Sequence, residues 1–155
     1  MGNYIRDLRK FVGHRPIMQC AASIICVNEK GQLLLGRRTD NRMWGYSGGS
    51  IELDEKAEDA AKRELLEEMG LIAEEIEFFF INSGPEAHYI YPNGDEVSNV
   101  EIIFLCRKYR GTPRPQPEEM DELRFFDPEE IDLEMISPPI RPVLKCYLDQ
   151  IGTGE

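Results

Sequence analysis

The chain has 155 residues and a mass of 17.8 kDa, the size of a single domain that can bury its own hydrophobic core. Apolar residues make up 41% of it and charged residues 30%, which excludes the composition of a disordered chain. The 29 acidic residues outnumber the 18 basic ones, and the formal net charge is -11. A field of that sign repels nucleic-acid polymers and anionic membranes. It also repels phosphorylated metabolites unless bound cations reverse the local charge.

The N-terminus carries no targeting pattern. Residues 1–11 mix charged and apolar side chains without an apolar core segment or a cleavage site. They predict a short amphipathic helix within an N-terminal extension over residues 1–15. Apolar runs such as 102–106 are far too short to span a membrane. The four cysteines lack the spacing of a metal site, so we interpret them as free thiols and expect a cytoplasmic protein.

The first predicted elements are two strands. Residues 18–27 and 32–36 are apolar runs typical of strands, and the residues between them, 29–31, have turn chemistry. The two strands are therefore predicted to form a hairpin.

The most regular helical segment covers residues 55–69 and follows a polar, glycine-rich stretch over 37–50. Asp54 is expected to cap its N-terminus, because a short side-chain oxygen can accept hydrogen bonds from the first turn. Gly70 is expected to end it, because glycine readily adopts the left-handed conformation found after helix C-termini.

The rest of the chain predicts further strands and a second helix. Strong turn chemistry at 92–95 predicts a second hairpin, and the proline-rich segment 111–117 is expected to be a loop. The expected strands are 76–81, 87–91, 97–107 and 123–126, with a closing helix over 138–151. Strands separated by one central helix and ended by another indicate an α/β layer fold with a mixed sheet. No linker is long enough to divide residues 1–155 into two domains.

Three acidic residues share one face of the central helix. Glu64, Glu67 and Glu68 are separated by three and four positions, and Glu64 and Glu68 overlap the edge of the apolar stripe that contains Leu65. Carboxylates crowded at a buried edge repel and take up protons unless a cation keeps them charged. Mg²⁺ or Mn²⁺ suits such an all-oxygen cluster. The alternative is a glutamate-rich helix face that is simply solvated.

The spacing around these acids favours the first interpretation. Gly49, five residues, Glu55, seven residues and then 63–71 reproduce the pattern G-x5-E-x7-R-E-U-x-E-E-x-G-U, where U is apolar. This is the Nudix box, here residues 49–71, and the chain resembles the Nudix hydrolase superfamily, in particular its MutT-like members. The resemblance implies an α/β/α sandwich with a mixed, curved β-sheet, in a single Nudix hydrolase domain.

The resemblance also implies an activity and a set of metal ligands. Proteins of this family use Mg²⁺ to hydrolyse a phosphoanhydride bond in a nucleoside diphosphate linked to another moiety. The matching metal-binding positions are Glu55, Glu64, Glu67, Glu68 and the backbone carbonyl of Gly48.

The other catalytic positions follow from the same likeness. Arg63 is expected to orient the glutamates, one helical turn before Glu67. The proton acceptor differs among family members, so Glu64, Glu67 and a loop glutamate all stay open. Glu119 is preferred to Glu118 or Glu122 as that loop acid.

Two positions near the box depart from the family pattern. Ser47 stands where the family commonly has proline in W-x-x-P-G-G, and Asp54 stands where glycine commonly precedes the first glutamate. Neither change removes an expected metal ligand.

The substrate is less well defined. Arg37, Arg38 and Arg42 are candidates to meet substrate phosphates, or are ordinary surface residues. Trp44 either stacks on a base or fills the core. On the strand over 97–107, the polar residues Asn99 and Glu101 share a face and are candidates to line a pocket.

Three functions follow as alternatives. The leading one is hydrolysis of an ADP-ribose, dinucleoside polyphosphate or nucleotide-sugar type of substrate. The second is a nucleoside triphosphate pyrophosphatase of the housecleaning type, and the third a non-catalytic module that senses a nucleotide. The expected partner is a small nucleotide, with no nucleic-acid polymer and no membrane, and the protein is expected to be a monomer or a homodimer.

Overall fold

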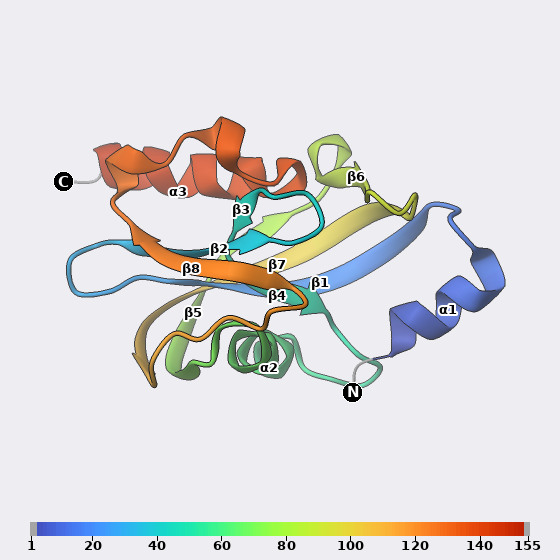
Figure 1. Cartoon of the computed structure of the whole chain (residues 1–155), viewed down its shortest axis with the longest axis horizontal. Helices are drawn as coiled ribbons and strands as arrows, with labels where there is room; N and C mark the ends of the chain where they lie inside the picture. The colour runs from blue at the N-terminus through green and yellow to red at the C-terminus, as the bar shows by residue number, and fades with distance from the viewer. Residues whose placement is uncertain (1–2, 154–155) are drawn as a thin grey trace.

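The computed structural model describes residues 3–153, and in it helices cover both sides of a layer of strands (Figure 1). The helices are α1 (Tyr4–Val12), α2 (Ala57–Met69) and α3 (Arg141–Thr153). The strands are β1 (Ile17–Cys26), β2 (Leu33–Arg38), β3 (Trp44–Gly45), β4 (Ser47–Ser50), β5 (Ile72–Asn82), β6 (His88–Ile90), β7 (Glu96–Arg110) and β8 (Met120–Phe126). Short 3-10 helices are η1 (Pro85–Ala87), η2 (Pro128–Glu130), η3 (Leu133–Met135) and η4 (Pro138–Ile140).

The strands form two sheets. The larger one has the order β4-β1-β7-β5, with β6 also paired to β7, and the smaller one has the order β3-β2-β8. Within the larger sheet, β1 and β7 run parallel and the other pairs are antiparallel. The sheet is therefore mixed, as the sequence predicts.

Alternation along the central strands divides the core between the two helices. Ile24 of β1 packs in a cluster with Leu65 of α2, whereas its neighbour Ile25 packs in a second cluster with Leu144 of α3. Successive side chains of a strand point to opposite faces of the sheet, so one apolar run contributes residues to the core on both sides. Figure 1 shows the result, with α2 on one side of the strands and α3 on the other. The expected α/β/α arrangement with a mixed sheet is confirmed.

The first predicted hairpin is only partly right. Val27 and Leu33 form a bridge across the turn, but β1 and β2 then enter different sheets. Both hydrogen-bonding edges of β1 are already occupied, one by β7 along the whole strand and the other by β4. The strand β2 consequently pairs with β3 and β8 instead.

The predicted cap of the central helix is wrong at one end and right at the other. The helix α2 begins at Ala57, with Lys56 in the capping position, while Asp54 adopts a left-handed backbone with a φ of 65°. The reason is a tight turn in which the Glu55 N–H donates to the Glu52 carbonyl. At the other end Gly70 has a φ of 73° and its N–H donates to the Leu66 carbonyl, as expected.

The remaining elements agree with the sequence in kind but not in length. The strand expected over 76–81 extends to the whole of β5, and the one expected over 123–126 to the whole of β8. The closing helix begins at Arg141, because residues 138–140 form the 3-10 turn η4. None of the helices within residues 3–153 is long and apolar enough to cross a membrane.

The predicted N-terminal helix is present as α1. Its Arg9 donates from Nη2 to the Glu96 carbonyl at 2.7 Å, which joins α1 to the start of β7. Residues 1, 2, 154 and 155 lie outside the described part of the chain, so the boundaries of a single domain over 1–155 stay a prediction.

Candidate active site

Two glycines of β4 allow close approaches, one to the central helix and one to strand β1. A Cβ built on Gly49 would lie 2.5 Å from the carboxylate of Glu64, and a Cβ built on Gly48 would overlap the side chain of Ser23. Any larger residue would push the carboxylate or the neighbouring strand away. Gly49 thus lets β4 lie directly against the Glu64 carboxylate of α2, and Gly48 lets it lie close to the Ser23 side chain of β1.

Arg63 is the centre of an ion-pair network beneath this contact. Its guanidinium binds the Glu55 carboxylate with both ends, through Nε at 2.8 Å and Nη2 at 2.9 Å. Its Nη1 donates to Glu64 at 2.9 Å and to Glu67 at 3.4 Å, and Nη2 also reaches the Ser50 carbonyl at 3.1 Å. The hydrogen bonds from Arg63 hold the pKa of Glu55 below its usual value. One planar side chain therefore fixes three of the expected ligand carboxylates, which supports the orienting role predicted for Arg63.

Glu68 is the most buried of the helix acids, with 6% of its surface exposed. Its Oε1 accepts hydrogen bonds from the Ser47 hydroxyl at 2.9 Å and from the Gly48 N–H at 3.0 Å. Burial, followed by the charge of Glu64, raises the pKa of Glu68 to about 8. Burial also raises the pKa of Glu64, against the opposing effect of Arg63. Two acids of the box are thus crowded and desolvated, as their positions on the helix predict.

Glu119 lies close enough to this cluster to influence it electrostatically. Its charge contributes to the raised pKa of both Glu64 and Glu68. The loop before β8 is attached to the end of α2, since the Gln116 N–H donates to the Glu68 carbonyl at 3.1 Å. The other two candidate acids have partners elsewhere. Glu118 of the loop accepts from the Gln116 side chain, and Glu122, which lies within β8, is 3.8 Å from Arg37.

The donor chemistry of this cluster fits a divalent cation. Hard cations prefer oxygen ligands, and the acids of α2 supply carboxylate oxygens; the Gly48 group that contacts Glu68 is its N–H. A bound cation would relieve the repulsion between Glu64 and Glu68. Within residues 3–153 no three acidic, histidine or cysteine side chains already converge as a metal cage. Arg63 occupies oxygens of Glu55, Glu64 and Glu67.

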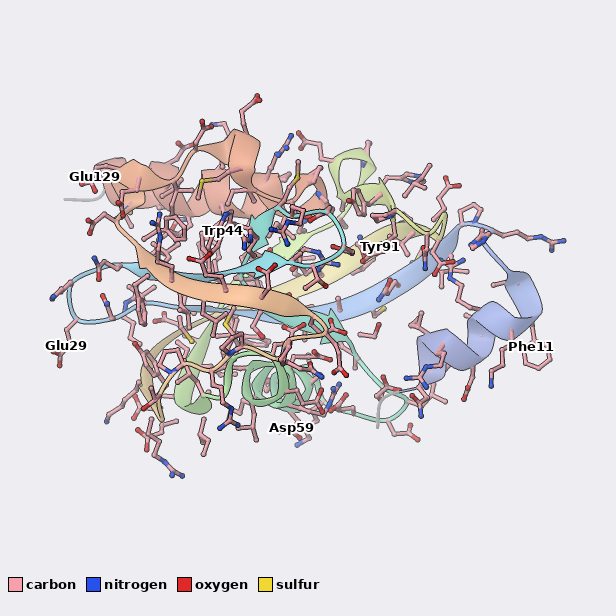
Figure 2. The ribbon with its side chains drawn as sticks, in the orientation of Figure 1. Phe11, Glu29, Trp44, Asp59, Tyr91 and Glu129 are labelled. Atoms are coloured by element: carbon pink, nitrogen blue, oxygen red, sulfur yellow. The ribbon has the colours of Figure 1, made fainter. Side chains whose placement is uncertain are left out.

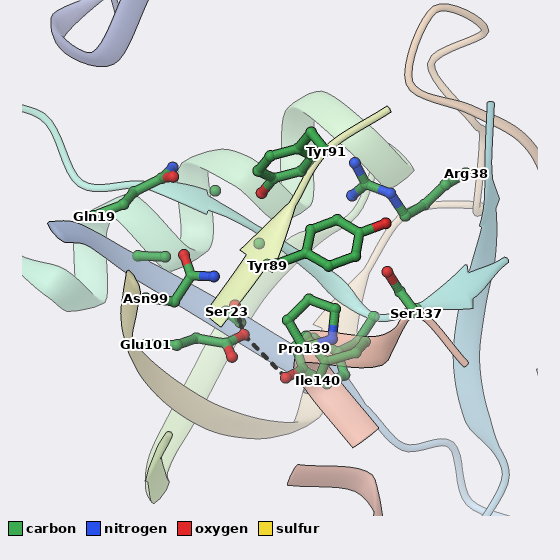
Figure 3. Close-up of a pocket in the computed structure, with 15 residues that line it drawn as sticks. Gln19, Ser23, Arg38, Tyr89, Tyr91, Asn99, Glu101, Ser137, Pro139 and Ile140 are labelled. Atoms are coloured by element: carbon green, nitrogen blue, oxygen red, sulfur yellow. Dashed lines mark hydrogen bonds between the residues drawn. The ribbon is translucent and has the colours of Figure 1, made fainter. Parts of the chain in front are cut away.

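A pocket of about 100 Å³ adjoins the acid cluster. Gly48 and Gly49 form part of its lining, so they border the pocket on one side and the helix acids on the other. Strands β1 and β7 contribute its floor, and the rings of Tyr89 and Tyr91 lie across from that floor (Figure 3). Its polar lining residues are Gln19, Ser23, Arg38, Asn99, Glu101 and Ser137.

The predicted substrate residues fall in different places. Arg38 lines the pocket, where Asp40 holds its guanidinium at 2.9 Å and 2.6 Å and the ring of Tyr91 lies 5.9 Å away. Arg37 is not part of the lining. It binds Asp121 at 2.9 Å, and Arg42 binds the same carboxylate at 2.6 Å.

Trp44 also lies outside the pocket lining. Its ring packs edge-on against Phe126 with the ring centres 5.0 Å apart, and it belongs to the core next to α3 (Figure 2). Of the two interpretations given by the sequence, the structure agrees with the filling of the core.

Asn99 and Glu101 do line the pocket, as their shared strand face predicts. The sequence did not identify Gln19, Ser23 or Tyr91 as part of the same site. A signal for Tyr91 was present, because Tyr89 and Tyr91 alternate on one side of an extended segment just before the turn at 92–95.

Comparison with known proteins identifies the family. The NUDIX domain model matches residues 18–146. A MutT-like protein of Streptomyces ambofaciens is 31% identical over 120 residues, which cover 77% of this chain and 71% of that protein. The chain therefore belongs to the Nudix family. It is a Nudix hydrolase of the MutT-like type.

Other relatives match over shorter segments. An RNA pyrophosphohydrolase of a Marinomonas species is 43% identical over 65 residues, 42% of this chain and 38% of that protein. A putative 8-oxo-dGTP diphosphatase of Bacillus subtilis is 47% identical over 49 residues, 32% of this chain and 33% of that protein. Among solved structures, a MutT Nudix hydrolase from Burkholderia pseudomallei has a TM-score of 0.69 at 24% identity, covering 84% of this chain and 97% of that one. This structural likeness supports the fold.

Proposed function

We propose that the protein is a Mg²⁺-dependent pyrophosphohydrolase that cleaves a phosphoanhydride bond in a small nucleoside diphosphate derivative. The observation that carries the proposal is the shared boundary at Gly48 and Gly49. These residues contact the acids of α2 and also line the pocket. A nucleoside held in the pocket would have its phosphates directed to the carboxylates, where a cation is needed.

The chain's own residues provide most of the machinery for water attack on phosphorus. The expected metal positions are Glu55, Glu64, Glu67, Glu68 and the Gly48 carbonyl. Bound there, Mg²⁺ would offset phosphate charge and lower the pKa of a coordinated water. Arg63 keeps three of these carboxylates close together, which limits how far they must move when a cation and substrate bind.

We further propose Glu119 as the group that accepts the proton from the attacking water. Glu64 and Glu67 are both held by the Arg63 guanidinium, so neither carboxylate can turn toward a water without loosening that ion pair. Among residues 3–153, Glu119 makes no ion pair, and it is exposed beside the buried acids. An exposed loop carboxylate can approach the water without breaking the network around Arg63.

Arg38 is the cation that we propose for the substrate phosphates. It lines the pocket and is aligned by two hydrogen bonds to Asp40. Arg37 and Arg42 are instead joined through Asp121, away from the pocket lining.

A nucleoside triphosphate is the second candidate substrate, favoured by the likeness to a putative 8-oxo-dGTP diphosphatase. Likeness to RNA pyrophosphohydrolases makes a 5′-triphosphorylated RNA a third arm of the test. The net charge of -11 opposes a long polyanion, so we propose a small nucleotide over RNA.

The test is a substrate panel assayed for release of phosphate or mononucleotide. It contains ADP-ribose, dinucleoside polyphosphates, nucleotide sugars, NADH, nucleoside triphosphates and a short 5′-triphosphorylated RNA, each with Mg²⁺ and with EDTA. We expect turnover of at least one small nucleotide with Mg²⁺ and its loss with EDTA. Turnover that persists in EDTA would reject the metal mechanism. Nucleotide binding without any turnover would favour a sensing module.

A further inference from the structure

A buried carboxylate lies at the floor of the pocket and takes no part in the acid cluster. Glu101 is 6% exposed and lines the pocket from β7. Its Oε2 accepts hydrogen bonds from the Ser23 hydroxyl at 2.6 Å and the Tyr46 hydroxyl at 2.9 Å, and its Oε1 accepts one from the Asn82 amide at 3.3 Å. Among residues 3–153 it makes no ion pair. An acid in such a position needs a structural or a ligand-binding reason.

The hydrogen bonds of Glu101 do not use its full capacity. A carboxylate has about four acceptor positions, two on each oxygen. Ser23 and Tyr46 together account for both positions on Oε2, whereas Oε1 accepts from Asn82 and has capacity for one more donor. Because Glu101 lines the pocket and has this remaining capacity, it can accept a hydrogen bond from a ligand N–H group.

The neighbouring amides make the same floor rich in acceptors. Asn99 donates its amide N–H to the Ala87 carbonyl at 3.0 Å, and Gln19 donates its own to the Ser50 hydroxyl at 2.5 Å. One N–H of each amide is engaged in this way, and each amide also carries a carbonyl oxygen that can accept a hydrogen bond. In the register of β1 and β7, Gln19 is opposite Asn99 and Ala21 is opposite Glu101, so these groups form one compact surface.

The opposite side of the pocket suits a flat ring. Tyr89 and Tyr91 pack edge to face, with ring centres 5.0 Å apart, and Pro139 adds a further apolar surface (Figure 3). Aromatic side chains stack on any nucleobase. The acceptors on the floor distinguish among the bases by the hydrogen-bond donors that each base carries.

We infer that Glu101 determines base specificity by accepting a hydrogen bond from the exocyclic amino group of a purine. The inference deepens the proposed function and rests on it, because it places the base of the nucleotide substrate in the pocket beside Gly48 and Gly49. In a base with a carbonyl in place of the amino group, the carbonyl oxygen would face the Glu101 carboxylate. Two acceptors would then repel, and the pocket would bind this base weakly.

The first experiment compares nucleotides that differ by one group, using the wild-type protein. Guanosine and inosine diphosphates differ only by the 2-amino group, and xanthosine diphosphate has a carbonyl at that position together with a hydrogen on the adjacent ring nitrogen. Adenosine and purine riboside diphosphates form a second pair, with and without the 6-amino group. Binding with Mg²⁺ is measured by calorimetry. We expect loss of the recognised amino group to weaken binding about 10- to 100-fold in one of the two series.

The second experiment reverses the hydrogen-bonding character of the floor with Glu101→Gln. The amide can donate as well as accept, so the preference for the amino-bearing base should fall to about threefold or less, or pass to xanthosine. The control is Tyr46→Phe, which removes one donor to the same carboxylate but leaves the carboxylate itself. It should keep the wild-type selectivity ratio even if both affinities fall. Circular dichroism and thermal melting check the fold of each variant.

The outcomes separate the inference from the function on which it rests. If the wild-type protein binds every member of each series with equal affinity and still hydrolyses nucleotides, the role of Glu101 is overturned and the proposed function stays intact. A Glu101→Gln protein that folds and keeps the wild-type ratio would also overturn it. Failure to bind or hydrolyse any nucleotide would overturn both.

Discussion

The acid cluster and the pocket lie on either side of the same two glycines, yet they are assembled from different parts of the chain. Apart from Glu119, the cluster draws on residues 48–68, which a single strand and the following helix bring together. The pocket combines β1, β7, the segment of Tyr89 and Tyr91 and the turn η4, which are distant in sequence. A local motif can therefore hold the chemistry constant while residues far from it set the choice of substrate.

The largest effect is expected from removing one of the box acids, which tests whether the acid cluster carries the chemistry. Glu67→Gln or Glu68→Gln should lower kcat by about 100-fold or more, because each removes a carboxylate from the expected metal and proton-transfer site. The assay is steady-state turnover of the best substrate from the panel. The control is Glu58→Gln, an exposed acid in the first turn of the same helix, which should stay within about twofold. Wild-type rates in both box variants would reject the assignment of the cluster.

The next test moves a box acid without deleting it. Gly49→Ala places a methyl group 2.5 Å from the Glu64 carboxylate, so the acid or the strand must shift. We expect kcat to fall by about 100-fold, because displacements near 1 Å are costly in catalysis. Gly152→Ala is the matched control, since a Cβ there meets nothing within 4 Å. Equal activity of the two variants would show that the close approach of β4 and α2 is dispensable.

Glu101 should make the stability of the folded protein depend on pH, independently of catalysis. Burial raises the pKa of this acid, so between its usual pKa and the raised one the folded protein binds more protons than the unfolded chain. The free energy of unfolding therefore falls as pH rises across that window, by about 1.4 kcal/mol for each unit of the rise in pKa. The pKa values of Tyr46 and Tyr91, the titratable neighbours, are also raised, mainly by burial, so both stay neutral there.

Glu101→Gln should abolish this part of the pH dependence. Urea unfolding at pH 5 and at pH 8 compares the two proteins. The variant should gain stability relative to wild type at the higher pH. A parallel pH dependence in both proteins would mean that Glu101 ionises normally despite its burial.

The smallest expected effect comes from Trp44. Trp44→Phe should leave KM within about twofold, because the ring packs on Phe126 and lies outside the pocket lining, and should lower stability by about 1 to 2 kcal/mol. Substrate titration and thermal melting measure the two quantities. A large rise in KM with an unchanged melting temperature would show that Trp44 contacts the substrate.

The sequence predicted the acid cluster well because its information is local. Spacings of three and four residues place Glu64, Glu67 and Glu68 on one helix face whatever surrounds them, and Gly70 ends the helix by its own conformational freedom. Asp54 failed as a cap because Glu55 is held by Arg63 and by the Glu52 N–H, and these contacts impose a turn before the helix. A tertiary ion pair thus overrode a local preference.

The pocket could be predicted only in part. Asn99 and Glu101 share a strand face by simple alternation, which the sequence gives directly. That Gln19 lies opposite Asn99 depends on the register of two parallel strands whose partners are 80 positions apart, from Gln19 to Asn99. No local pattern encodes that pairing. The same limit explains why the β1–β2 hairpin was expected to continue, since competition for the edges of β1 is decided by distant strands.

The alternation of β1 has a consequence for how such a protein can change over evolutionary time. Ala22 and Ile24 pack toward α2, whereas Gln19, Ala21 and Ser23 line the pocket. Neighbouring positions of one strand thus carry separate duties, one set for the shared scaffold and the other for ligand choice. A descendant could exchange every second residue at this end of β1 and acquire a new preference while inheriting an intact interior. Libraries randomised at those alternate positions alone would be a compact starting point for redesign.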